Sequence, residues 1–134
     1  MRLATAQPAL TTQVITSHIQ IILIITGILT ATTLVQFVAP SWVLRHAYGE
    51  IPTGAGNIAL ARHWGLLLFC VGMLLVYSAF YPPLRESAVV LASIEKAGFV
   101  ALVATSLYRR PIALFMAVGD AVIVLVFVFY LAGF

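Results

Sequence analysis

The sequence predicts an all-α integral membrane protein, a bundle of four transmembrane helices. Of its 134 residues, 63% are hydrophobic and only 8% are charged, and the mean hydropathy is +1.11. Soluble domains carry about 25% charged residues, and a small water-soluble fold could not hide so much apolar surface, because small proteins keep a large fraction of their surface exposed. Lipid is therefore the expected solvent, and we expect a multi-pass protein of the cell membrane or an inner membrane.

Four long apolar stretches supply the predicted helices. They cover residues of about 15–38, 58–81, 87–107 and 112–134. Each provides the roughly 20 residues that a helix needs to cross a hydrocarbon core about 30 Å thick. Pro40, Pro82 and Pro111 follow the first three stretches, where a helix is expected to stop. Residues 1–134 are thus predicted to form a single transmembrane domain.

The predicted helices are rich in β-branched residues, which in water would favour strands. Only an α-helix or a closed barrel satisfies every backbone group in lipid, and the alternating segments of about ten residues that mark a barrel do not occur. A cleaved signal peptide is the alternative for the first stretch. Its apolar run is longer than a typical signal core, Arg2 is the one basic residue before it, and no small-residue cleavage site follows it. We expect it to be a mature helix.

The connections between the predicted helices differ in length. The second and third are short, so the last three helices should be antiparallel neighbours. The first, residues 39–57, is longer and contains Trp42, Arg45, His46 and Tyr48. Aromatic residues beside basic ones are typical of a segment lying at the level of the lipid headgroups. A gate or a lid over a ligand is the alternative interpretation.

The basic residues predict an orientation. Arg45, Arg109 and Arg110 lie in the first and third connections, whereas Arg2 and Arg85 lie on the other side. By the positive-inside rule, the first and third connections are cytoplasmic and both termini lie outside. The net charge is only +3 and the basic residues form no stripe, so no nucleic acid is expected as a partner.

Ionisable residues inside the apolar stretches are the candidates for function, because an intramembrane charge is costly unless it is paired or hydrated. They are Arg62, His63, Glu95, Lys96 and Asp120. At 1.5 Å per residue, Lys96 and Asp120 should lie within about 3–5 Å of each other in depth, which predicts an ion pair. Glu95 points about 100° away from Lys96 around the helix. It should therefore need another partner, and Arg62 or His63 could reach it.

These five residues have two interpretations. They could form a ligand-binding or proton-handling polar cluster, with the charges at the floor of a pocket. They could instead form a structural ion-pair network that fixes the register of the helices. The sequence alone leaves both open.

Small and hydroxylated residues predict how the helices pack. Gly65, Gly72 and Ala79 form a heptad stripe suited to close helix contact, and Gly98 and Gly119 should let backbones approach beside the charged residues. Hydroxyls at Thr26, Thr30 and Thr33 are expected to bond to their own helix backbone. The single cysteine, Cys70, excludes an internal disulfide, and its apolar surroundings predict a buried, unreactive thiol.

Cofactor sites are not predicted. His18, His46 and His63 lie at depths that do not match the two facing histidines of a bundle haem site. The sequence contains no zinc motif, Walker loop, GxSxG elbow or dinucleotide fingerprint. We therefore expect no metal and no cofactor.

Three short motifs resemble those of a known group of membrane proteins. They are Arg62-His63-Trp64-Gly65, Glu95-Lys96 and Gly119-Asp120. Together they resemble small four-helix membrane proteins of the DoxX-like kind, in which polar residues recur within apolar helices. The resemblance covers the last three helices. It implies a quinone-linked or partner-subunit role, and it carries over no catalytic residue.

Three functions are compatible with these features. The first is a binding or accessory subunit that holds an apolar ligand, a quinone or a lipid, and orients its polar end by the polar cluster, or that docks on a larger membrane complex. The second is a small proton-coupled transporter or channel acting as a homo-oligomer, in which Glu95 or Asp120 titrates. The third is a membrane enzyme acting on an isoprenoid or sterol, with one of these acids as acid/base and His63 assisting.

Overall fold

The computed structural model describes residues 10–50, 53–105 and 110–133, and within these ranges the chain is helical with no strand. Four of its helical segments are long and apolar enough to cross a membrane. They are Val14–Val38, Ala55–Phe80, Pro82–Thr105 and Pro111–Leu131. The predicted all-α fold and its four apolar spans are confirmed, while the predicted ends at residues 107 and 134 lie outside the described residues.

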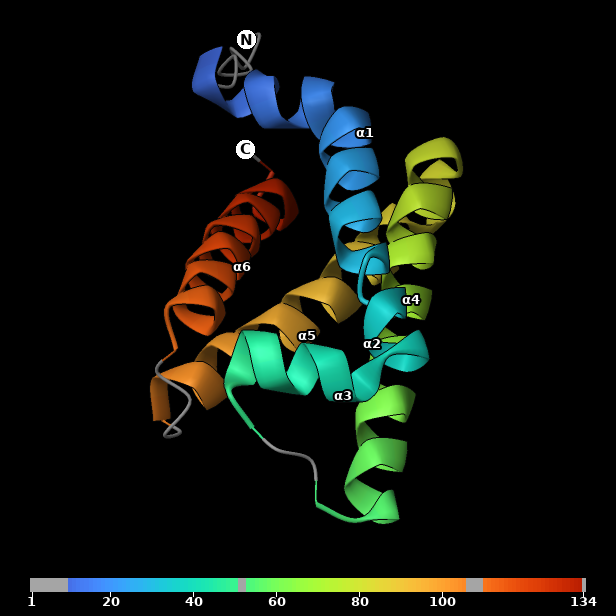
Figure 1. Cartoon of the computed structure of the whole chain (residues 1–134). Coiled ribbons are helices and arrows are strands. Elements are labelled where there is room, and N and C mark those ends of the chain that lie inside the picture. Colours follow the sequence, from blue (N-terminus) through green and yellow to red (C-terminus); the bar gives the residue numbers. More distant parts are fainter. Residues whose placement is uncertain (1–9, 51–52, 106–109, 134) are drawn as a thin grey trace, which may run out of the picture.

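The helices follow one another with short connections (Figure 1). In chain order they are α1 (Leu10–Ala31), α2 (Leu34–Val38), α3 (Pro40–Val43), the π-helical η1 (Leu44–Tyr48), α4 (Ala55–Phe80), the 3-10 turn η2 (Pro82–Leu84), α5 (Arg85–Thr105) and α6 (Pro111–Leu131). The four long helices contact each other in a ring, α1 with α4, α4 with α5, α5 with α6 and α6 with α1. The contacts of α5 with both α4 and α6 agree with the predicted neighbours.

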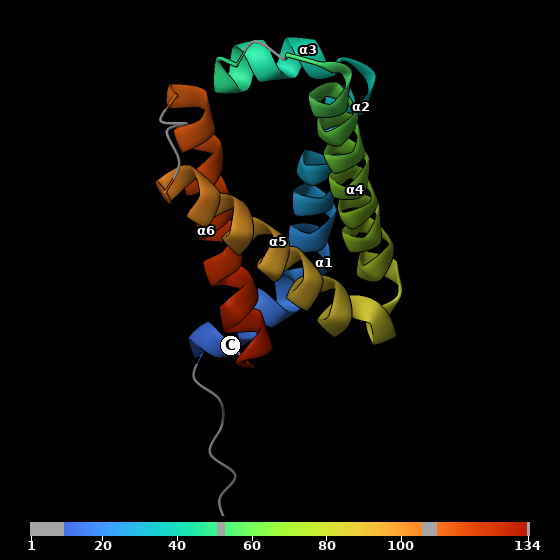
Figure 2. The same ribbon diagram turned by 90° about the horizontal axis from the view of Figure 1, so that it is seen from below.

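One half of this ring is densely packed. Leu23, Leu75, Val89, Ala79 and Phe127 come from all four long helices, and each is fully buried. We call these five residues the packed half. Leu75 and Ala79 lie near the end of α4 and Val89 lies near the start of α5, so the packed half is at the end of the molecule where α4 leads into α5 (Figure 2). The burial of these residues joins the four helices.

Glycines let the first span approach α4 closely. A Cβ added at Gly72 would lie 2.5 Å from the backbone nitrogen of Ala31, and one at Gly65 would lie 2.8 Å from that of Phe37. No real Cβ makes such contacts, so only glycine fits at these crossings. The predicted small-residue stripe is confirmed, since Ala79 on the same stripe is also fully buried.

Gly98 and Gly119 behave differently from that stripe. A Cβ added at either position would meet nothing within 4 Å. The expectation that they bring backbones together beside the charges is therefore wrong. Both glycines are exposed, so a larger side chain can be placed at either position without a clash at its Cβ.

The first span is broken, although the sequence predicted one helix over residues 15–38. α1 ends at Ala31, and α2 begins at Leu34 after a turn at Thr32 and Thr33. The hydroxyl of Thr32 donates to the carbonyl of Leu29 at 2.5 Å, and that of Thr33 donates to the carbonyl of Thr30 at 2.6 Å. Such side-chain bonds compete with the helix backbone and bend it.

The turn between α4 and α5 is closed by Arg85. Its Nε donates to the carbonyl of Ser78 at 3.1 Å, and its Nη2 donates to that of Ala79 at 2.7 Å. A cation at a helix C-terminus satisfies carbonyls that have no partner in the helix and interacts favourably with the helix dipole. This short connection makes α4 and α5 neighbours.

The first connection forms α3 and η1, which lie across the opposite end of the molecule (Figure 2). Trp42 stacks on His46 with ring centroids 4.7 Å apart. η1 ends at Gly49, which has a φ of 71°, and a Cβ there would collide with the guanidinium of Arg110. The segment is thus anchored beside the start of α6. Its predicted place at the lipid headgroups stays a prediction.

Candidate functional site

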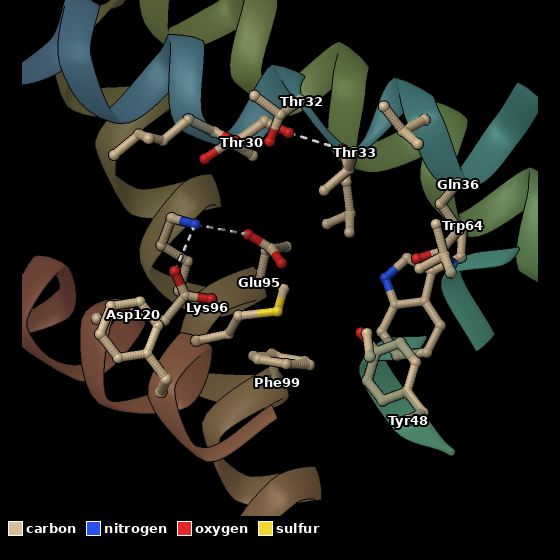
Figure 3. A pocket seen from close by; sticks show the side chains of 18 of the residues that line it. Thr30, Thr32, Thr33, Gln36, Tyr48, Trp64, Glu95, Lys96, Phe99 and Asp120 are labelled. Atoms are coloured by element: carbon tan, nitrogen blue, oxygen red, sulfur yellow. Dashed lines mark hydrogen bonds and ion pairs between the residues drawn. The ribbon is translucent and has the colours of Figure 1, made fainter. Parts of the chain in front are cut away.

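A cavity of about 520 Å³ lies beneath α3 and η1, in the half of the molecule opposite the packed half. It is lined by residues of α1, α2, α3, η1, α4, α5 and α6, and of the turn between α1 and α2. Most of the lining is apolar or aromatic, as in many ligand sites of this size. We call the part of the protein around this cavity the hollow half (Figure 3).

An ion pair lies in the cavity wall, near the middle of α5 and of α6. The Nζ of Lys96 donates to Oδ1 of Asp120 at 2.9 Å, and Lys96 is only 4% exposed. Because this contact joins neighbouring helices at matching depth, the Lys96–Asp120 pair predicted from the sequence is confirmed.

Glu95 faces the same lysine. Its Oε2 lies 3.7 Å from Nζ of Lys96, which is close enough for a charge interaction and too long for a hydrogen bond. The expectation that Glu95 needs a different partner is wrong, because a long lysine side chain can bend back toward the preceding residue. Oε2 is buried and accepts no hydrogen bond from the described residues. The second carboxylate oxygen points toward the open middle of the cavity (Figure 3).

Arg62 and His63 do not join the cluster. Both are exposed, and among the described residues no hydrogen bond or ion pair links either one to the acids. Trp64 takes the cavity face of α4 instead, and at 3.6 residues per turn His63 and Arg62 are turned about 100° and 200° away from it. The predicted five-residue cluster is therefore reduced to Glu95, Lys96 and Asp120, which we call the charged triad.

The wall formed by the first span is polar but already satisfied. Thr30 donates to the carbonyl of Thr26 at 2.9 Å, and Thr33 donates to that of Thr30 at 2.6 Å. Gln36 uses its Nε2 to reach the carbonyl of Ala61 at 3.0 Å. The predicted bonding of threonine hydroxyls to their own backbone is confirmed for Thr30 and Thr33, and these bonds occupy the donors of this wall.

The cavity wall also contains aromatic residues that the sequence interpretation did not assign to the site. Tyr48 from η1, Trp64 from α4 and Phe99 from α5 line the same cavity as Glu95 (Figure 3). Phe99 follows Glu95 by four residues on one helix, and such a pair shares a face, so this neighbour was readable from the sequence. Tyr48 was not, because its place depends on how the first connection folds.

Tyr48 is also coupled electrostatically to the triad. Burial raises the pKa of its phenol above the ordinary value, and the negative charge of Asp120 raises that pKa further. The phenol therefore stays protonated throughout the physiological pH range and keeps an O–H group at the cavity wall.

A second cavity of about 460 Å³ lies against α4 and α5. Glu95, Trp64 and Leu68 line both cavities, so the carboxylate stands at their boundary. Cys70 also lines the second cavity and is exposed. The prediction of a buried cysteine is wrong, because Cys70 lies on the outer surface of α4.

The described residues contain no group of three or more His, Cys, Asp or Glu side chains that could hold a metal ion. His18 and His46 each hydrogen-bond to a carbonyl of their own helical segment, those of Val14 and Trp42, both at 2.8 Å. The chemistry available in the cavity is thus that of two carboxylates, one ammonium group, a phenol and aromatic surfaces.

The fold and the site define a class of protein, a helical chain with four apolar spans around a charged cavity. Comparison with family models, with curated proteins and with solved structures finds no match. The resemblance to DoxX-like proteins therefore stays a prediction, and function is argued from the site alone.

Proposed function

We propose that this chain is a multi-pass integral membrane protein that binds an amphiphilic, largely apolar ligand in the hollow half, with the polar end of the ligand at the charged triad. The four apolar spans support insertion into lipid. So do large apolar side chains on the outer faces of the helices, including Leu60, Ile94 and Val118, each more than 60% exposed. In water, such exposed apolar faces would cause aggregation.

One observation carries the binding proposal. Glu95 borders an apolar cavity near the middle of its span and accepts no hydrogen bond from the described residues. Leaving a buried polar atom unsatisfied costs about 1–3 kcal/mol, and more for a charged group. A purely structural ion-pair network would be expected to satisfy this carboxylate. The other carboxylate oxygen points into the cavity, where a bound ligand group could pair with the carboxylate (Figure 3).

The cavity is reached from the side. Phe115 and Trp42 belong to its lining and are 81% and 58% exposed, on surfaces that would face lipid. Because the lining extends to this outer surface, an apolar ligand dissolved in the bilayer would reach the cavity without crossing water. This favours binding of a membrane-soluble molecule over a water-soluble one.

Two glycines provide a matched test of binding. Gly119 lines the cavity and has free space around an added Cβ, whereas Gly98 has the same freedom outside the cavity. Native mass spectrometry of protein extracted gently from its own membranes should show a small molecule at fixed stoichiometry on the wild type and on Gly98→Leu. Gly119→Leu should lose it by filling the cavity. A bare wild-type protein, or equal retention in both variants, would refute the proposal.

A proton-coupled carrier acting as a homo-oligomer is the second candidate. The observation that favours it is the position of Glu95 at the boundary of two cavities, where one titrating group could face either side. Flux of a membrane-permeant ligand in proteoliposomes, driven by a pH gradient and lost in Glu95→Gln, would support it. A monomeric protein without flux would exclude it. An enzyme using His63 has less support, because that side chain is exposed and outside the cavity lining.

The orientation predicted from the basic residues also stays part of this proposal. Arg45 and Arg110 lie at the end covered by α3 and η1, and Arg85 lies at the other (Figure 2). Arg2 and Arg109 lie outside the described residues. The proposal places the covered end, formed by α3 and η1, on the cytoplasmic side.

A further inference from the structure

The charges of the triad do not balance. Lys96 supplies one positive charge, while Glu95 and Asp120 supply two negative charges. Lys96 makes its hydrogen bond to Asp120 and only a longer contact to Glu95. No other cationic side chain lines either cavity among the described residues. With both acids ionised, the site carries one uncompensated negative charge within an apolar span.

The hydrogen-bonding groups of the first span and of Lys96 point in the same direction. The donors of Thr30, Thr33 and Gln36 are bound to backbone carbonyls, and the hydrogen bond of Lys96 goes to Asp120. What remains available at Glu95 is an acceptor. A quinone head presents carbonyl acceptors and would find no hydrogen-bond donor at this carboxylate. A cation would be attracted by its negative charge.

The aromatic residues around Glu95 add a second preference for positive charge. Trp64, Phe99 and Tyr48 line the cavity into which the carboxylate points (Figure 3). A cation over an aromatic face gains about 0.5–2 kcal/mol, most when it is removed from water. A carboxylate combined with aromatic walls is the chemistry that recognises alkylated ammonium groups.

We propose that the ligand of the hollow half is a lipophilic cation, an amphiphile with an ammonium-type head, and that this head and a proton occupy Glu95 in turn. This inference rests on the proposed binding function and names its ligand class. In the empty site a proton on Glu95 neutralises the triad. When the cation binds, that proton leaves to the aqueous phase and the positive head takes its place, so the charge of the site is unchanged.

The pH dependence of this exchange has few contributors. The titratable groups that line the two cavities with Glu95 are Lys96 on α5, Asp120 on α6, Tyr48 on η1 and Cys70 on α4. The first span contributes no titratable side chain to the lining, and its polar lining residues are threonines and Gln36. Displacement of one proton predicts that the affinity for the cation rises about tenfold per pH unit while Glu95 is protonated in the empty site, and then levels off.

The test uses the full chain in detergent and two probes of similar shape. Tetraphenylphosphonium carries a positive charge, and triphenylphosphine oxide is neutral. We expect calorimetry to show that, at high pH, where Glu95 is ionised, the wild type binds the cation at least about tenfold more tightly than the neutral probe. At lower pH, where the affinity for the cation still rises with pH, one proton should be released per cation bound in a weakly buffered solution. Glu95→Gln should abolish both the preference for the cation and the proton release. Glu86→Gln, an exposed acid on the same helix, should change neither.

The outcomes separate this inference from the proposed function. Binding of both probes with equal affinity at high pH, or cation binding that releases no proton at any pH, would overturn the cation inference and leave ligand binding intact. Binding of neither probe, together with a bare wild-type protein in the mass spectrum, would overturn both. If Glu95→Gln does not fold, Trp64→Leu replaces it. That variant should lower the affinity for the cation more than the affinity for the neutral probe. An equal loss of affinity for both probes would count against the inference.

Discussion

The packed half and the hollow half use the same four helices in opposite ways. In the packed half, Leu75 and Phe127 are fully buried between neighbouring helices. In the hollow half, the same helices diverge around a cavity of about 520 Å³ whose wall contains a charged triad. The difference teaches that dense packing and the proposed binding site lie in separate regions, so stability and binding can be tested by separate substitutions.

Truncation at the packed half should have the largest effect on stability. Leu75→Ala removes a fully buried side chain and should lower the free energy of unfolding by about 2–5 kcal/mol. Leu68→Ala, in the cavity wall, should cost less than half as much, because its side chain already borders a void. Denaturation in mixed micelles followed by circular dichroism measures both. Equal losses of unfolding free energy in the two variants would show that the two halves do not differ in packing.

A pair of glycine substitutions should show a smaller but cleaner contrast. Gly72→Ala places a Cβ against the backbone of Ala31 and should cost about 1–3 kcal/mol through overpacking. Gly119→Ala meets open space and should be neutral or stabilising by up to about 1 kcal/mol, because alanine is the better helix former. The same unfolding measurement applies. A stable Gly72→Ala variant would contradict the close crossing of α1 and α4.

Neutralising Asp120 should alter binding more than folding. Asp120→Asn frees Lys96 to pair with Glu95, which leaves the triad without net charge. The affinity for tetraphenylphosphonium should fall about tenfold or more, while the affinity for the neutral probe should stay unchanged. An unchanged cation affinity in calorimetry would show that the charge count does not govern the site.

The phenol of Tyr48 should give the smallest effect, visible at alkaline pH. Its pKa is raised in the folded protein by burial and then by Asp120. The folded state therefore holds this proton more tightly than the unfolded state. The contribution of Tyr48 to the free energy of unfolding is fully present below the ordinary tyrosine pKa and is lost as pH rises through the raised pKa. Tyr48→Phe should remove this part of the stability loss at alkaline pH. Spectrophotometric titration of the phenols should lose a component that titrates above the ordinary tyrosine pKa.

Much of the fold was predictable because lipid imposes simple rules. Span length and apolarity predicted the four helices, and the small-residue stripe of Gly65, Gly72 and Ala79 predicted the close crossing. The break at Thr32 and Thr33 was missed, because it depends on hydroxyl bonds that compete with a helix whose apolarity continues through it.

The site was predicted in part for a related reason. Depth along two neighbouring helices was enough to pair Lys96 with Asp120. Rotation about the helix axis was not enough to place Glu95, because the flexible lysine bends back toward it. The outward position of Arg62 and His63 depends on which face of α4 turns to the cavity, and the sequence alone does not fix that face.

Tryptophan fluorescence tests the central claim most directly, because Trp42 and Trp64 are the only two tryptophans and both line the cavity. A spin-labelled alkylammonium amphiphile, added to the delipidated protein, should quench this fluorescence saturably at fixed stoichiometry in the wild type and in Gly98→Leu. Gly119→Leu should show only the weak, unsaturable quenching of random collisions. Equal saturable quenching in all three proteins, or none in the wild type, would contradict the assignment of ligand binding to the hollow half.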